Sequence, residues 1–251
     1  MKKSIILVVL FLSLYSYGQQ KIDSASSIIA SANPYATKAG EAMYEKGGNA
    51  YDAITAAAFT LSVVEPSMSG LGGRLQVIHR NAKGKIKGLD ATTLVPEKFN
   101  PAEAKEEDGY TTIGVPGVVK GLIELHQAGG LLPLEVVMGP AINYAKNGFQ
   151  LLTDEADRIK SVKKELLLFS STKKHFFKND SLLKGGELFV QPALASTLEE
   201  IGVDKGKSFY TGTTAANLSK EIQSGGGSLS LSDLANYKTQ NSTIHKGNYR
   251  G

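Results

Sequence analysis

The segment AYDAITAAAFTLSVV, residues 50–64, constrains the fold more than any other part of this chain. Its residues are small and apolar nearly all round a helix, so the helix that they predict is buried on most of its faces. Asn49 can cap this helix, with Asp52 at the third helical position in the arrangement of a capping box. The alanines allow close approach, and we therefore expect a helix that other elements contact on most sides.

The stretch EPSMSGLGGRLQV, residues 65–77, follows this helix and places Gly70, Gly72 and Gly73 close together before Arg74. Glycines spaced this closely indicate unusual backbone dihedrals or a close approach by another group. A nucleotide-binding loop is excluded, because the lysine of the GxxxxGK[ST] pattern is missing and the order here is helix and then strand. We interpret the pair Gly72-Gly73 as structural, since large side chains would obstruct the tight passage from helix into strand.

The remaining pattern predicts helices around a small number of strands, in one domain without internal repeats. Asn33-Pro34 can begin an earlier helix, which Gly47-Gly48 ends. Two strands are expected at residues 74–80 and 84–90. Further helices are expected at residues 118–127, 134–146, 154–168, 192–201 and 213–223, and Ser230 with Asp233 marks a capping box before residues 234–238.

Cysteine is absent from the 251 residues, which excludes a disulfide framework, a thiolate nucleophile and a cysteine metal site. The formal net charge of +4 does not by itself argue for nucleic acid. Residues 1–20 place Lys2 and Lys3 before an apolar run that is too short for a stable membrane span, the pattern of a secretory signal peptide. We expect a periplasmic or secreted bacterial protein; an uncleaved anchor is the alternative.

No catalytic constellation is complete from the residue types and spacings alone. The histidines, His79, His126, His175 and His245, are far apart and form no HExxH motif, so we interpret them as surface or structural residues rather than metal ligands. No GxSxG motif marks a serine nucleophile. The basic stretch at residues 158–178 interleaves lysines with aromatic residues, and we interpret it as the solvated face of a helix and a loop rather than as a nucleic-acid site.

The segment GGNAYDAITAAAFTLSVVEPSMSGLGG, residues 47–73, resembles the signature of the gamma-glutamyltransferase (gamma-glutamyltranspeptidase) family. That family has GGNA-x-DAA, an alanine-rich helix, VVEP and a glycine-rich turn. The similarity spans nearly the whole chain after residue 20, in order, through GVPGVVKGL (114–122), PAINYAKNGF (140–149), FVQPALASTLEEI (189–201), FYTGTTAANLSKEI (209–222), GGSLSLSDLANYK (226–238) and GNYRG (247–251).

The resemblance implies an α+β fold of the N-terminal-nucleophile hydrolase class, an αββα sandwich that is incomplete in this chain. Family members are exported precursors that cleave themselves into a large and a small subunit. The new N-terminal threonine of the small subunit attacks a gamma-glutamyl amide such as that of glutathione, with its own α-amine as the base. Water or an amino acid then resolves the acyl-enzyme, and no metal or organic cofactor is expected.

The resemblance further implies a signal peptide at residues 1–20 and, at residues 21–251, a C-terminally truncated large-subunit portion. Its partners would be the small subunit of the same precursor, in a heterodimer, and a small gamma-glutamyl substrate, with no nucleic acid and no stable membrane span. The family's catalytic threonine lies beyond the segment YRG that ends this chain. We therefore expect no catalytic residue in this chain, and the fragment alone to be inactive.

Three positions, in two segments, depart from the family pattern. In LDATTLVP, residues 89–96, Thr92 stands where the family has an arginine that pairs with the α-carboxylate of the gamma-glutamyl group. The family's third and fourth turn glycines are Arg74 and Leu75 here. Our hypothesis is that Arg74 replaces the missing carboxylate anchor, since a guanidinium can bind a carboxylate through two hydrogen bonds. The alternative is that Arg74 packs against the partner subunit or faces solvent.

Three alternatives to a gamma-glutamyltransferase remain open. The first is an acylase or a poly-gamma-glutamate-processing relative with a different acyl preference, for which Thr92 is the argument. The second is a non-catalytic secreted remnant of the fold, and the third is the product of a broken or incompletely sequenced gene. We favour part of a working enzyme, because the capping boxes, glycine turns and apolar faces are intact throughout.

Overall fold

The computed structural model describes residues 27–102 and 109–251, so the predicted signal peptide at residues 1–20 lies outside the described residues. The helices are α2 (Pro34–Glu45), α3 (Ala50–Val64), α4 (Val118–Gly129), α5 (Leu134–Asn147), α6 (Thr153–Ser161), α7 (Lys163–Leu166), α8 (Ser170–Phe176), α9 (Pro192–Asp204), α10 (Lys207–Thr211), α11 (Thr213–Ser224) and α12 (Leu231–Asn236), with a 3₁₀ turn at Tyr110–Thr112. The strands are β1 (Leu75–Arg80), β2 (Ile86–Ala91), β3 (Phe149–Gln150), β4 (Phe177–Lys178), β5 (Ser181–Leu182), β6 (Leu188–Phe189) and β7 (Gln240–Ser242).

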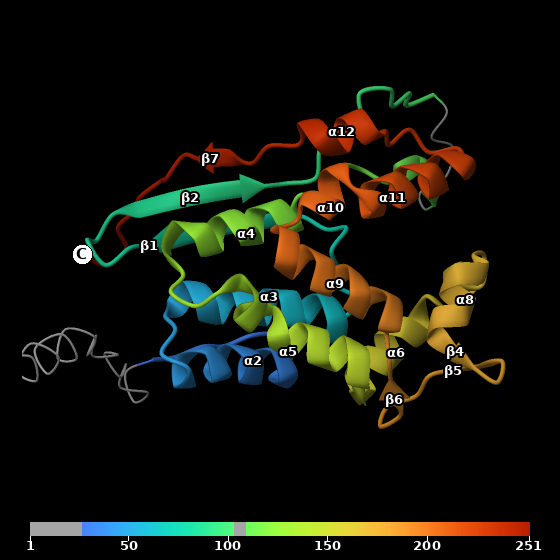
Figure 1. Ribbon diagram of the computed structural model, residues 1–251, viewed down its shortest axis with the longest axis horizontal. Coiled ribbons are helices and arrows are strands. Elements are labelled where there is room, and N and C mark those ends of the chain that lie inside the picture. The colour runs from blue at the N-terminus through green and yellow to red at the C-terminus, as the bar shows by residue number, and fades with distance from the viewer. Residues whose placement is uncertain (1–26, 103–108) are drawn as a thin grey trace, which may run out of the picture.

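These elements form a sheet that lies on a stack of helices (Figure 1). The sheet has the order β1-β2-β7, with both pairings antiparallel. Helix α4 lies directly beneath it, and α2, α3, α5 and α9 form the next layer (Figure 1). The predicted hairpin is confirmed to within a residue or two at each strand end, whereas β7, which lies about 150 residues further along the chain, was not foreseen.

Helix α3 has the bounds that the sequence predicts, and its burial is confirmed. Asn49 and Asp52 form the predicted capping box. At the other end, the side chain of Asn33 donates to the Val64 carbonyl at 3.4 Å, and Gln191 donates to the Val63 carbonyl at 2.7 Å. Because these carbonyls have no partner within the helix, the two amides satisfy groups whose burial would otherwise cost stability.

The predicted helix at residues 154–168 is wrong in its extent. The structure has two helices, α6 and α7, with Val162 between them at φ −106° and ψ 25°. The hydroxyl of Ser161 donates to the Arg158 carbonyl at 2.7 Å, a local hydrogen bond that bends or ends helices. The chain then turns into α8, so most of the basic stretch lies on three short helices.

The two faces of the sheet differ. On the α4 face, Gly121 lies so close to Leu75 and Ala91 that a Cβ there would meet both side chains within 3 Å. On the other face, Ile78 is 75% exposed, since no described element covers it. Across residues 27–102 and 109–251, none of the helices combines the length and the apolar character that a bilayer crossing requires.

Gly117, at the start of α4, is expected to tolerate no side chain. A Cβ there would lie 2.1 Å from both the Ala91 carbonyl oxygen and the Tyr237 hydroxyl, and the first of these is backbone. Gly117→Ala in the full-length protein should therefore lower the free energy of unfolding by more than about 3 kcal/mol. Gly202→Ala, inside α9, is the matched control, because a Cβ at Gly202 would make only ordinary van der Waals contacts, at 3.6 Å or more. Denaturant titration should show the control unchanged or stabilised by about 0.5–1 kcal/mol; equal losses would contradict this account.

Candidate functional site

A cavity of about 580 Å³ opens where the glycine turn, residues 65–74, passes from α3 into β1. The turn forms one wall, α3 and α4 supply apolar walls, and Thr93 approaches from the end of β2. The lining residues are Ala58, Leu61, Ser62, Met68, Ser69, Gly70, Leu71, Gly73, Arg74, Leu75, Thr93, Val118 and Leu122. Arg74 is the one cation among them, so an anionic ligand in this cavity would be attracted to that side chain.

The glycines of the turn do not have the unusual backbone that their spacing predicts. None of Gly70, Gly72 and Gly73 has a positive φ. A Cβ at Gly70 or Gly72 would meet no described atom within 4 Å, whereas at Gly73 it would lie 3.2 Å from the Gly70 carbonyl oxygen. The described residues therefore do not support the prediction that a side chain at Gly72 would obstruct the passage into β1.

The turn is fixed to α4 through a backbone oxygen. The Gly73 carbonyl accepts hydrogen bonds from the N–H groups of Gly117 at 3.0 Å and Val118 at 3.2 Å. These donors begin α4 and have no partner within the helix, because the first N–H groups of a helix are always free of intrahelical bonds. The turn thus caps α4 while α4 supports the sheet, which fixes where β1 begins.

Arg74 and Thr92 occupy equivalent places on two neighbouring strands. The last pair of the β1–β2 ladder is Leu75 with Ala91, and Arg74 and Thr92 are the next residues on either side. Residues opposite each other in an antiparallel pair have Cβ atoms about 4.5–5.5 Å apart. The exposed Arg74 side chain makes no hydrogen bond or ion pair within residues 27–102 and 109–251.

Thr92 is held through its backbone. Its N–H donates to the Asp90 carboxylate at 2.9 Å, and its carbonyl accepts from the Tyr237 hydroxyl at 2.7 Å. Burial, together with the nearby charges of Asp90 and Glu124, raises the pKa of Tyr237 to about 12, so this phenol stays a donor at neutral pH. These contacts fix the main chain of Thr92, and its side chain takes part in neither of them.

A buried ionic network holds the other end of the turn to α6. Glu155 accepts from the Ser67 N–H at 2.8 Å and from the Ser67 hydroxyl at 2.7 Å. Through Nη1, Arg158 donates hydrogen bonds to Glu155 at 3.2 Å and to Glu65 at 3.3 Å. Sequence reasoning missed this network. Its only signal was a glutamate that shares the buried face of α6 with Ile159, and the 88 residues between Ser67 and Glu155 hide the pairing.

The two carboxylates of this network share one cation, which makes Glu65 sensitive to its surroundings. Burial and the charge of Glu155 raise the pKa of Glu65, while Arg158 acts in the opposite direction. A carboxyl whose pKa is raised on folding keeps its proton to higher pH in the folded state than in the unfolded one. Its ionisation therefore costs stability as the pH rises above the ordinary glutamate range.

The histidines lie apart in the structure. His79 contacts the Tyr51 hydroxyl through Nδ1 at 2.8 Å, His126 lies beside Asp52 at 3.3 Å, and Nε2 of His175 contacts the Gln191 side-chain oxygen at 3.3 Å. His245 is exposed. Among residues 27–102 and 109–251, no group of three or more His, Cys, Asp or Glu side chains has an arrangement that would hold a metal ion.

The chain is similar to known proteins in both sequence and structure. A family model described as gamma-glutamyltranspeptidase matches residues 36–251. The glutathione hydrolase proenzyme of Escherichia coli is 32% identical over 252 residues, which cover 94% of this chain and 43% of that protein. The crystal structure of Helicobacter pylori gamma-glutamyltranspeptidase superposes with a TM-score of 0.85 at 34% identity, covering 90% of this chain and 68% of that one.

A solved cephalosporin acylase from Bacillus halodurans is also similar, with a TM-score of 0.79 at 29% identity, covering 87% of this chain and 43% of that chain. The chain spans about two fifths of the length of the curated relatives that it matches. The likeness to the solved transpeptidase confirms the predicted fold class, the N-terminal-nucleophile hydrolase fold present here in part. The match of the family model over residues 36–251 confirms the family that the sequence motifs indicated.

Removing Arg158 should leave two buried carboxylates without their cation. We expect Arg158→Met to lower the free energy of unfolding by about 1–3 kcal/mol near pH 7, less than for a fully buried pair because the guanidinium is partly solvated. The loss should shrink towards pH 5, since protonation of Glu65 relieves the repulsion from Glu155. Urea titration at both pH values measures this, with Lys164→Met, an exposed lysine without an ion pair, as the control. A loss that is independent of pH would contradict this assignment.

Proposed function

Since this chain belongs to the gamma-glutamyltranspeptidase family, we propose that it is the large-subunit portion of an exported enzyme that cleaves gamma-glutamyl amides such as glutathione. The observation that carries this proposal is the family match, which runs through 36–251 without leaving out the turn, the hairpin or the later helices. Relatives named glutathione hydrolase proenzymes, including the one from Escherichia coli, support both the reaction and a precursor that is cleaved.

The proposed reaction uses a threonine of the small subunit as its nucleophile. The N-terminal threonine of the small subunit attacks the gamma-glutamyl carbonyl, and its own α-amine accepts the hydroxyl proton. The amide nitrogen leaves with a proton, and water or the amine of an amino acid then attacks the acyl-enzyme and releases the threonine. This chain supplies the walls of the substrate site and the cation that binds the substrate carboxylate, while no metal or organic cofactor takes part.

We assign the carboxylate-binding role to Arg74. Arg74 lines the cavity of about 580 Å³, and its guanidinium has no partner within the described residues. It also lies one residue beyond the last β1–β2 pair, opposite Thr92, which stands where the family has its arginine. A guanidinium at either position therefore starts from nearly the same place, and a bidentate bond to a carboxylate suits its planar geometry.

The remaining proposals rest on the family resemblance and, for the signal peptide, on the basic and apolar pattern of residues 1–20. Residues 1–20 are the signal peptide of a periplasmic or secreted protein, and residues 21–251 are the large-subunit portion. The small subunit of the same precursor is the partner in a heterodimer. The uncovered face of the sheet supports such a partner, because the side chain of Ile78 on that face is 75% exposed.

A second candidate function is an acylase, or a poly-gamma-glutamate-processing relative, with a different acyl group. Two observations support this second candidate function. Thr92 removes the family's cation from its usual place, and the solved relatives include a cephalosporin acylase at 29% identity. A non-catalytic remnant of the fold is the alternative from another class, and only isolation of the native protein separates it from an enzyme.

The native protein is expected to be a two-chain product whose smaller chain begins with threonine. Self-cleavage must free the α-amine of that threonine before it can act as nucleophile and base. Intact mass and N-terminal sequencing of the protein purified from its source measure this directly. A single uncleaved species would contradict the enzyme proposal and favour the non-catalytic remnant.

Arg74→Ala in the processed enzyme is expected to weaken transition-state binding of gamma-glutamyl substrates by about 2–3 kcal/mol, which is on the order of 30- to 150-fold in kcat/KM. The physical reason is the loss of a charge-assisted bond to the α-carboxylate. A 4-aminobutyryl anilide, which lacks that carboxylate, should be hydrolysed equally by both proteins, and glutaryl substrates test the acylase alternative.

Arg80→Ala, at the exposed end of β1, is the matched control for Arg74→Ala. Adding Thr92→Arg to the Arg74→Ala protein should recover part of the activity, because the two positions face each other across the hairpin. Unchanged kinetics of Arg74→Ala on gamma-glutamyl substrates would remove Arg74 from the site and leave the family assignment intact.

A further inference from the structure

A second cavity, of about 390 Å³, lies between helices α6 and α7 and the segment that follows β5. We propose that it binds a small polyanion carrying two or three carboxylate or phosphate groups. Its lining residues are Thr153, Ala156, Asp157, Lys160, Lys163, Asp180, Ser181, Leu182, Leu183, Lys184 and Gly185. Neither the family relationship nor the proposed hydrolysis assigns a role to this cavity.

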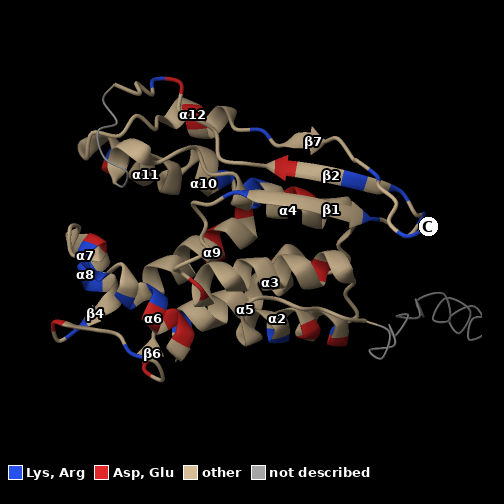
Figure 2. Ribbon diagram, turned by 180° about the vertical axis from the view of Figure 1, so that it is seen from behind, with Lys and Arg blue, Asp and Glu red and all other residues tan. Residues whose placement is uncertain are grey.

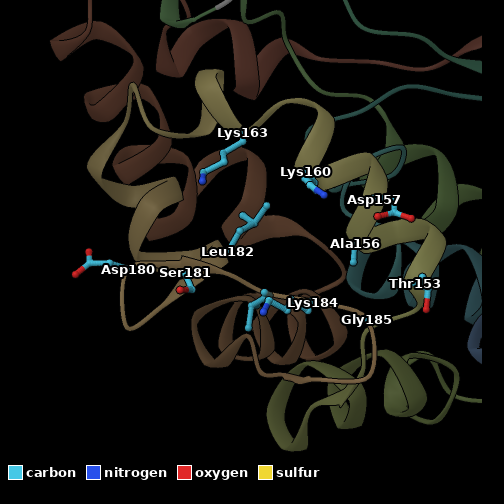
Figure 3. A pocket seen from close by; sticks show the side chains of 11 residues that line it. Thr153, Ala156, Asp157, Lys160, Lys163, Asp180, Ser181, Leu182, Lys184 and Gly185 are labelled. Carbon is cyan, nitrogen blue, oxygen red and sulfur yellow. The ribbon is translucent and has the colours of Figure 1, made fainter.

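Three lysines line the cavity from opposite sides. Lys160 and Lys163 belong to the α6–α7 side, and Lys184 belongs to the segment after β5, with Leu182 between them (Figure 3). None of the three amines forms an ion pair or hydrogen bond with a residue in 27–102 or 109–251. Unpaired like charges around one cavity repel each other, and a bound anion removes that cost.

The carboxylates nearby do not neutralise these amines. Asp180 pairs with Lys173 at 3.1 Å, outside the cavity, and its carboxylate is directed away from the opening (Figure 3). Glu187 accepts from the backbone N–H of Lys184 at 2.7 Å rather than from its amine. Asp157 is thus the one unpaired carboxylate on the lining, which leaves an excess of two positive charges. A ligand with two or three negative charges complements that excess.

The rest of the lining fits a small organic molecule. Thr153 and Ser181 present hydroxyl groups that donate hydrogen bonds to anionic oxygens, and Ala156, Leu182 and Leu183 offer an apolar surface for a short carbon skeleton. A cavity of this volume falls in the range of small-molecule sites. No aromatic side chain lines it, whereas strand-binding grooves for nucleic acid use aromatic rings as stacking platforms.

The cavity also suggests a role for two lysines of the basic stretch at residues 158–178. Figure 2 shows Lys and Arg positions, in blue, along α6, α7 and α8, with acidic positions among them. Lys160 and Lys163 line the cavity, whereas the neighbouring Lys164 does not, although all three lysines are exposed. The sequence interpretation of a solvated face therefore holds for all three lysines, and Lys160 and Lys163 in addition share the cavity with Lys184.

The test uses the purified native protein and two probes, citrate and pyrophosphate, in isothermal titration calorimetry at low ionic strength. We expect saturable binding of at least one probe, weakened by added salt because charge attraction carries it. Binding of citrate alone indicates that the site recognises carboxylates, and binding of pyrophosphate alone indicates that it recognises phosphates. Binding of both indicates that the site recognises negative charge without distinguishing the two groups. Each of these outcomes supports the proposal.

Two substitutions with opposite expected effects locate the binding. Lys163→Gln should weaken it about 10-fold, the effect of one charge-assisted hydrogen bond. Asp157→Asn should tighten it, since it removes the unpaired carboxylate. Lys164→Gln is the matched control, and thermal unfolding confirms that the variants fold. Absence of binding, equal effects of Lys163→Gln and Lys164→Gln, or stronger binding of an RNA oligonucleotide that Lys164→Gln also weakens would overturn the proposal.

Discussion

The burial of α3 is the constraint on which the rest of the structure depends, because a helix surrounded by protein must have its terminal polar groups satisfied by other segments. At its first turn, the fully buried Asp52 accepts hydrogen bonds from the N–H groups of Asn49, Leu131 and Leu132 and lies beside His126. Burial alone would raise the pKa of this carboxyl, but the hydrogen bond with His126, together with those from the three N–H groups, holds the pKa below its ordinary value. One side chain thus caps α3 and fixes the loop between α4 and α5.

The same helix determines where the candidate site lies. The glycine turn begins at the end of α3 and is attached to the rest of the structure at two places. Ser67 donates hydrogen bonds to Glu155 of α6, and the Gly73 carbonyl accepts hydrogen bonds from the N–H groups at the start of α4. Both attachments use buried or backbone groups, so the turn has little freedom between them. Arg74 follows directly and projects from a fixed backbone, a condition that binding a carboxylate in one orientation requires.

The parts of the fold that the sequence predicts well are those that local interactions decide. Asn49 and Asp52 define the start of α3 through contacts within four residues, and the capping box at Ser230 and Asp233 does the same for α12. Strand β7 was not predictable, since its polar residues acquire strand geometry only by pairing with β2, some 150 residues earlier. The Glu155–Arg158 network and the open surroundings of Gly72 depend likewise on which distant segments approach, information that no local pattern contains.

The exchange that we propose between positions 74 and 92 would need no change in the fold, because an antiparallel ladder places the two positions opposite each other. Because the β1–β2 register pairs Leu75 with Ala91, the next residue on either strand starts from the same region of the sheet end. A guanidinium can therefore reach one carboxylate from either backbone without a change in the fold. Its direction of approach differs, however: Arg74 comes from the glycine turn, which lines the cavity, whereas a side chain at Thr92 would come from the strand that Tyr237 holds. The orientation of the bound carboxylate should differ accordingly, and the acyl groups that fit beside it would change with that orientation.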